Sequence, residues 1–244
     1  MTAIATPPVS LVLAAVSLVG VHLLVGRLRI RSVPRSIWLS GAGGTSVAYV
    51  FVHILPELNH RQQDFAVESI AFLEHHVYLL ALVGFSLFYG LERFVKQSGS
   101  QPGKDGRESD SSSGVFSIHV GSFAAYNAIV GYLLVSRGGE PEELAFFVVA
   151  MALHFVVNDH SLREHHDESY DGVGRWILAS GLLAGVGVGW TTALSEVAVS
   201  TLFALLAGGI ILNVIKEELP RQRESNFWAF GGGSMGYAAM LLII

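Results

Sequence analysis

The stretch VAVSTLFALLAGGIILNVI, residues 197–215, is 19 residues long and contains no charged side chain. An α-helix rises about 1.5 Å per residue, so roughly 20 apolar residues cross the hydrocarbon core of a bilayer. Within lipid, a helix satisfies all of its own backbone hydrogen bonds. Residues 197–215 are therefore predicted to form a transmembrane helix.

Seven further apolar stretches resemble this one and lie on both sides of it. Hydrophobic residues make up 51% of the chain and charged residues 14%, against about 25% charged residues in an ordinary soluble domain. The sequence predicts an all-α polytopic membrane protein with eight transmembrane helices, in contact with the lipid bilayer. In chain order, the predicted spans are Val9–Val25, Ile37–Leu55, Val77–Phe94, Val115–Val135, Leu144–Val157, Trp176–Leu194, Val197–Ile215 and Phe227–Ile244.

The basic residues alternate between the predicted loops. Of the 15 Lys and Arg residues, 13 fall in the loops after the first, third, fifth and seventh spans, and only Arg61 and Arg137 fall elsewhere. Basic loops remain in the cytoplasm. Both termini are therefore predicted to be extracytoplasmic, in a plasma or cytoplasmic membrane. A missed or invented helix would break this alternation.

The segment between the third and fourth spans differs from the rest of the chain. Residues 97–114 read QSGSQPGKDGRESDSSSG and lack large apolar side chains, which predicts a flexible cytoplasmic linker. We expect three helices in residues 1–95, a loop in residues 96–114 and five helices in residues 115–244. Glycines recur within the spans, and small residues let membrane helices approach closely. They predict either tight packing or a moving helix interface.

Composition also excludes several classes of site. The chain has no cysteine, so it can form neither a disulfide nor a thiolate metal site. Its formal net charge of −5 gives no basic surface for nucleic acid, which is not expected as a partner. No nucleophile or general base stands out, so we do not expect an enzyme. A metal hydrolase would require His53, His154 and Asp159 to converge around an open metal position.

Polar side chains inside the predicted spans are the functional candidates. An ionisable group at a helix centre costs roughly 2.5–3.5 kcal/mol on insertion scales, so such groups mark functional sites by default. His22 and His119 also lie in apolar stretches, but neither has a partner within one helical turn, and we interpret them as structural or interfacial. The candidate ligands are His53, Glu57, Asn127, His154, Asn158, Asp159, Asn213, Glu217 and Glu218.

Their spacing predicts which side chains share a helix face. Residues four apart lie on one face of a helix, so His53 shares a face with Glu57, and His154 shares a face with Asn158. Asp159 follows His154 by five residues, about 140° further around the helix, and so points to a neighbouring face. Imidazole with carboxylate and amide oxygens suits zinc, manganese or iron. Interhelical hydrogen bonding without a metal would use the same groups, and the residues alone leave both interpretations open.

Two motifs resemble the ZIP (Zrt/Irt-like) family of divalent metal transporters. Residues 53–57 read HILPE, similar to the His-x-Leu-Pro-Glu element that ends the family's second helix, and residues 207–220, AGGIILNVIKEELP, resemble its seventh helix. The resemblance implies an eight-helix bundle with both termini outside, a variable cytoplasmic loop after the third helix, and a possible homodimer. It also implies Zn²⁺ or another divalent cation as cargo, with no tightly bound cofactor.

The chain departs from the family in the two helices that hold the family's metal centre. Where the family has His-Asn-x-x-Asp-Gly, residues 126–131 read YNAIVG, and where it has His-Glu-x-Pro-His-Glu, residues 154–159 read HFVVND. The usual binuclear centre cannot form from these residues. Amide ligands in place of charged or imidazole ligands would bind zinc weakly. The ligands that the resemblance still implies are Asn127, His154, Asn158 and Asp159, with Glu217 or Glu218 from the seventh helix.

Two functions are consistent with this pattern. The first is a divergent ZIP-like carrier that moves a divalent cation by alternating access. The second is a non-transporting relative that acts as a membrane sensor or a partner subunit. In that case the His-rich cytoplasmic loop His160–Asp171 would respond to metal or pH, because histidine titrates near physiological pH.

Overall fold

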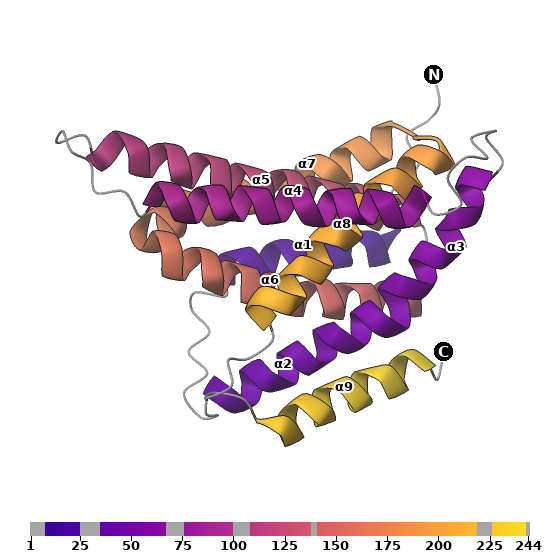
Figure 1. Cartoon of the computed structure of the whole chain (residues 1–244). Coiled ribbons are helices and arrows are strands. Elements are labelled where there is room, and N and C mark those ends of the chain that lie inside the picture. The colour runs from indigo at the N-terminus through magenta and orange to yellow at the C-terminus, as the bar shows by residue number, and fades with distance from the viewer. Residues whose placement is uncertain are drawn as a thin grey trace.

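The computed structural model describes residues 8–24, 35–66, 76–99, 108–137, 141–218 and 226–242. All regular elements in these ranges are helical (Figure 1). Short π-helical segments η2 (Val50–Ile54) and η4 (Val214–Glu218) continue α2 and α8, and η3 (Tyr170–Gly174) joins α6 to α7. The α-helices are α1 (Val9–Leu24), α2 (Arg35–Tyr49), α3 (Leu55–Ala66), α4 (His76–Gly99), α5 (Glu108–Arg137), α6 (Pro141–Ser169), α7 (Arg175–Thr191), α8 (Glu196–Asn213) and α9 (Phe227–Leu242).

Several of these helices have the length and composition of membrane spans. Helix α1 is also apolar but shorter. The all-α class is confirmed for the described residues, and the apolar helices are those of an integral membrane protein, while the count of eight spans stays a prediction. The five long spans are His76–Val95, Gly114–Arg137, Leu144–His166, Tyr170–Thr191 and Glu196–Lys216.

The helices extend further than the hydropathy pattern predicts. The prediction that His160–Asp171 forms a loop is wrong, because α6 runs through Ser169 and is followed directly by η3. Residues 160–169 contain no glycine or proline that would end the helix. Helices α4 and α5 likewise enter the segment 97–114 that was predicted as a linker, whose residues 100–107 lie outside the described ranges.

A proline accounts for the irregular end of the second predicted span. Pro56 has no backbone N–H and cannot make the α-helical bond to residue 52. The helix widens into the π-helical segment η2 immediately before it and then continues as α3 to Ala66, beyond the predicted end at Leu55. Segments of this kind often occur at functional sites, and η2 contains His53.

Each long helix packs against a partner that is distant in the sequence. Helix α5 lies on α7, α4 on α8, α2 on α9 and α1 on α6 (Figure 1). In three of these pairs, a Cβ atom on a glycine would collide with a backbone oxygen of the facing helix. The prediction of tight packing is confirmed there. The collisions join Gly185 to Ala128, Gly208 to Ala81 and Gly233 to Gly41.

The glycine-packed helices of each pair run in the same direction. Along α5 and α7, Gly181 meets Ala124 and, further on, Gly189 meets Val135, so the residue numbers rise together. Helices α4 and α8 follow the same order, because Gly84 contacts Leu205 and, further along, Glu92 pairs with Lys216. Helices α2 and α9 do so as well, because Gly41 contacts Gly233 and Tyr49 contacts Tyr237. In a chain that crosses a membrane back and forth, helices two, four or six spans apart must be parallel.

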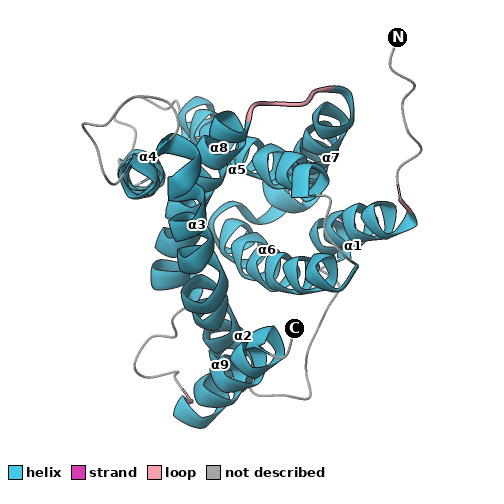
Figure 2. Cartoon of the chain, turned by 90° about the vertical axis from the view of Figure 1, so that its right-hand side faces the viewer, coloured by secondary structure: helices cyan, strands magenta, loops and turns pink. Residues whose placement is uncertain are grey.

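Helix α6 occupies the middle of the bundle. Figure 2 shows it between α1 and the α2–α9 pair, and it contacts α1, α2, α5 and η4. Its side chains Met151 and Phe155 are fully buried. The polar residues Asn158 and Asp159, which follow on α6, are buried as well and face the interior of the bundle.

The glycine contacts make a testable prediction about α7. Gly185→Ala should destabilise the protein by about 1–3 kcal/mol, because the new methyl group meets the backbone of α5, which cannot move aside without separating the helices. Gly187→Ala, on the same helix, meets no atom of the described residues within 4 Å and should be neutral or stabilising by up to about 1 kcal/mol. Thermal unfolding in detergent measures both, and equal behaviour of the two variants would contradict the packing.

Candidate functional site

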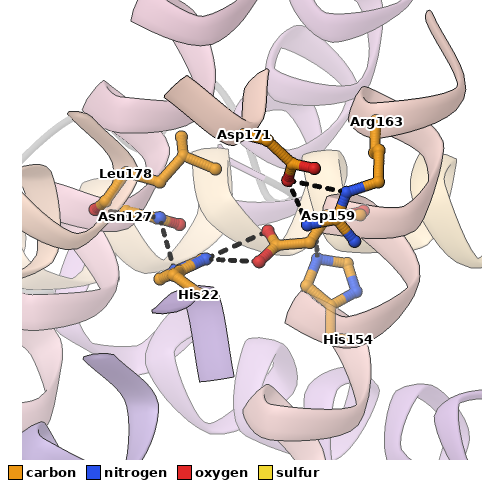
Figure 3. A network of polar contacts seen from close by, with 8 residues as sticks. His22, Asn127, His154, Asp159, Arg163, Asp171 and Leu178 are labelled. Carbon is orange, nitrogen blue, oxygen red and sulfur yellow. Dashed lines mark hydrogen bonds and ion pairs between the residues drawn. The ribbon is translucent and has the colours of Figure 1, made fainter. Parts of the chain in front are cut away.

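Asp159 is the only acidic side chain among the fully buried residues of the described ranges. Both of its carboxylate oxygens accept from Nδ1 of His22 in α1, at 3.0 and 2.9 Å (Figure 3). His22 is itself only 1% exposed. A buried carboxylate without a partner is strongly destabilising, and a paired one is tolerated when its remaining lone pairs are satisfied. The pair therefore links α1 to α6 in the interior.

Asn127 of α5 completes the surroundings of the His22 ring. Its Nδ2 donates to the carbonyl oxygen of Leu178 in α7 at 3.2 Å and to Nε2 of His22 at 2.9 Å (Figure 3). A carbonyl oxygen can only accept, so the amide nitrogen has to face it. Nε2 of His22 is then an acceptor, and the ring proton lies on Nδ1, toward Asp159. The Leu178 carbonyl thus determines which atoms donate and which accept in this group of three side chains, the His22 cluster (His22, Asn127 and Asp159).

A second group, the His154 cluster (Tyr126, His154 and Asn158), lies on the neighbouring face of α6. Nε2 of His154 lies 2.9 Å from the Tyr126 hydroxyl and 3.0 Å from Nδ2 of Asn158, so it is within hydrogen-bond distance of both groups. All three side chains are buried. The predicted sharing of a face by His154 and Asn158 is confirmed, and so is the different direction of Asp159.

Phe155 separates the two clusters. Its ring stacks on the His22 ring with the centroids 4.5 Å apart, and its centroid lies 6.4 Å from that of His154. The fully buried Phe155 ring adds apolar surroundings on the side of each imidazole. The two clusters together form a buried polar network in which α1, α5 and α6 meet.

A pocket lies beside the His154 cluster, between α4, α5, α6 and α8. Asn158 and Asn213 line it, together with Glu92, His119 and His165. We call it the His119 pocket. Asn213 is buried, and within the part of the chain that the structure describes its Nδ2 has no hydrogen-bond partner. The predicted candidates Asn158 and Asn213 therefore border one cavity, although they come from different helices.

The structure does not bring His53 and Glu57 to the buried polar network. They line a separate pocket, the His53 pocket, with Arg61 and Arg137. Arg137 donates to Nε2 of His53 at 2.7 Å, and Arg61 pairs with a Glu57 oxygen at 2.7 Å. Both predicted ligands are thus held by guanidinium groups. The convergence of His53 with His154 and Asp159 that a hydrolase would require is not present.

The predicted acidic ligands of the seventh span are not tested. Glu217 and Glu218 lie in η4 next to Asn213, but their side chains fall outside the described residues. Among the side chains that are described, no group of three or more His, Asp or Glu residues is already arranged to hold a metal ion.

His22 and His119 are the residues that the sequence analysis missed. Both have polar partners on other helices, which the sequence does not indicate. His22 bonds to side chains 105 and 137 positions away, and Nδ1 of His119 lies 2.9 Å from Nε2 of His166. The sequence contains one indication of their role, which is that each histidine lies inside an otherwise apolar helix. Because an ionisable side chain is costly to bury in a membrane, such a histidine is a candidate functional residue.

Comparison with known proteins does not assign this chain to a family. No protein-family model matches the chain, and no curated protein matches it either. Two imidazoles, a carboxylate and two amides can relay protons, hold a hydrated cation or join helices by hydrogen bonds.

Removal of His22 tests the pairing with Asp159. His22→Ala leaves a carboxylate buried and unpaired, so the free energy of unfolding should fall by about 3–5 kcal/mol. His160→Ala removes a more exposed imidazole that pairs with Glu164, and it should cost less than about 1 kcal/mol. Chemical unfolding in detergent measures both variants.

A double variant serves as the internal check. Asp159→Ala added to His22→Ala removes the stranded charge, so the double variant should be less destabilised than the sum of the two single variants. Additive losses would contradict a direct interaction between the two side chains.

Proposed function

We propose that this protein is an integral membrane carrier for a divalent cation, such as Zn²⁺, and a divergent relative of the ZIP type with eight transmembrane helices and extracytoplasmic termini. The observation that carries the proposal is the fully buried Asp159 paired with His22 where α1, α5 and α6 meet. Ionisable side chains inside membrane helices are costly, and they mark ion and proton pathways. Asp159 is the central ligand of the proposed cation site.

The directions of the helices support the eight-span topology. Each of the glycine-packed pairs joins two predicted spans that are separated by an even number of crossings, and each pair is parallel, as such a topology requires. The distribution of basic residues supports the same topology independently, with 13 of 15 on one side.

The positions of the two pockets support alternating access. On α5, His119 lines the His119 pocket and precedes Asn127 in the sequence, whereas Arg137 lines the His53 pocket and follows Asn127. On α8, Asn213 lines the first pocket and Glu196 the second, nearly at opposite ends of the helix. The buried polar network lies between these levels. A carrier needs such a central site, reached from one side at a time.

Cation binding would be coupled to the packing of α5 on α7. A cation held by Asp159 and Nδ1 of His22 requires the ring proton to move to Nε2. Asn127 then has to present its oxygen to that proton, and it gives up its hydrogen bond to the Leu178 carbonyl. Because Leu178 belongs to α7, occupancy of the site favours a changed contact between α5 and α7, which is the differential interaction that a conformational shift needs.

The departures from the ZIP motifs fit this altered site. Tyr126, in the position of a family histidine, is hydrogen-bonded to His154, and Phe155, in the position of a family glutamate, stacks on His22. His22, which comes from α1, supplies an imidazole that the motif comparison does not include. The proposed site is therefore rebuilt around Asp159 and His22, with Asn127, His154 and Asn158 as further polar groups.

Uptake into proteoliposomes tests the proposal. Purified protein should give saturable uptake of at least one of zinc, iron, manganese and cadmium. Asp159→Asn should lower the initial rate at least tenfold, because it removes the only buried charge among the described residues that can neutralise the cation. His154→Ala, beside the site, should also reduce uptake.

A matched carboxylate controls for non-specific effects. Glu168→Gln removes an exposed carboxylate from the same helix and should leave the rate unchanged. Equal uptake by wild type and Asp159→Asn would remove Asp159 from the transport site. Equal losses in both carboxylate variants would mean that the effect is not specific to the buried site.

The second candidate function is a non-transporting membrane sensor or partner subunit. The observation that favours it is the hydrogen bonding within the His22 cluster, in which Nδ1 of His22 bonds to Asp159 and Nδ2 of Asn127 bonds to His22 and to the Leu178 carbonyl oxygen. Such a network can join helices with no cargo. Folded wild-type protein that takes up none of the four cations would support this function over the carrier.

A further inference from the structure

Three histidines gather where α5 and α6 lie side by side, outside the buried polar network. Nδ1 of His119 and Nε2 of His166 are 2.9 Å apart, and the centroids of the two rings are 5.2 Å apart. The His165 ring centroid lies 6.2 Å from that of His119 and 6.5 Å from that of His166. We call these residues the imidazole triad.

The spacing of the imidazole triad is close to that of three imidazoles on one metal ion. With Zn–N distances of about 2.0–2.1 Å and tetrahedral angles, two ligating nitrogens lie about 3.3 Å apart and their ring centroids about 5.2 Å apart. The His119–His166 pair already has this centroid separation. The third ring has to approach the other two by about 1 Å to reach the same geometry.

His165 is already held in a tautomer that suits metal binding. Its Nδ1 lies 2.8 Å from the carbonyl oxygen of Ser161. That oxygen can only accept, so the proton lies on Nδ1 and the lone pair on Nε2. Histidines that bind metals commonly donate their other N–H to a carbonyl in this way, which orients the ring.

The surroundings of the imidazole triad are polar on one side. His119 and His165 line the His119 pocket together with Asn158 and Asn213. Asn213 is 5% exposed, and its Nδ2 has no hydrogen-bond partner among the described residues. Buried polar groups are nearly always hydrogen-bonded, so a buried amide without a partner points to a polar ligand of this pocket. Its N–H can donate to a water molecule or an anion that accompanies a metal ion.

We propose that His119, His165 and His166 form a binding site for a borderline divalent transition metal ion such as Zn²⁺, Co²⁺ or Ni²⁺. Three imidazoles favour these ions over Mg²⁺ or Ca²⁺, which prefer oxygen ligands. Binding replaces the hydrogen bond between His119 and His166, and the proton of that bond moves to the other nitrogen of its own ring. The site lies at the predicted cytoplasmic end of the bundle and does not depend on transport through Asp159.

Cobalt binding to the purified full-length protein in detergent tests the proposal. Co²⁺ in a site with nitrogen ligands gives visible absorption bands, which titration and displacement by Zn²⁺ can follow. The double variant His119→Gln/His166→Gln should weaken binding at least tenfold. His160→Gln removes a histidine of the same helix that is not part of the triad, and it should leave the affinity unchanged.

Two further variants separate the possible outcomes. Asp159→Asn should retain the cobalt signal, so a failure of the proposed carrier and a failure of this site are distinguishable. If the double variant does not fold, His165→Gln reports instead, because this side chain is exposed and its loss should not affect folding. Cobalt binding that is absent from wild type, or unchanged in the triad variants, would overturn the proposal.

Discussion

The pairing of a buried carboxylate with a histidine from another helix is the interaction on which the interior of this protein depends. Asp159 is fully buried, and in an apolar bundle it requires a partner. His22 supplies it, and Asn127 in turn orients His22 by its bond to the backbone of α7. Four helices, α1, α5, α6 and α7, are joined by this one set of donors and acceptors, so their relative positions are mutually constrained.

Close glycine contacts make that arrangement possible. Backbone contact of α5 with α7 at Gly185 brings the Leu178 carbonyl within reach of a side chain as short as asparagine. Equivalent contacts at Gly208 and Gly233 hold two more parallel pairs. The hydrophobic effect contributes little to contacts between helices in lipid, so packing and hydrogen bonding have to determine which helices associate. In this protein, close packing at Gly185 and the hydrogen bond from Asn127 to Leu178 both join α5 to α7.

The proposed functions use different parts of the same bundle. The buried network around Asp159 is the proposed cargo site, and the imidazole triad is a proposed metal site nearer one end of α5 and α6. The His119 pocket borders both, because Asn158 bonds to His154 and His165 belongs to the triad. At the other pocket, by contrast, arginines hold His53 and Glu57, so a cation there would have to compete with guanidinium groups.

The sequence by itself determined the helical class, the apolar spans, and the faces of α6, since these follow from hydropathy and from the fixed rotation per residue of a helix. It therefore placed His154 with Asn158 and directed Asp159 elsewhere. Only the tertiary structure decided which helices meet. That decision made His22 the partner of Asp159, joined His119 to His166, and separated His53 from the network. Contacts between residues more than a hundred positions apart depend on packing between helices, which local periodicity does not specify.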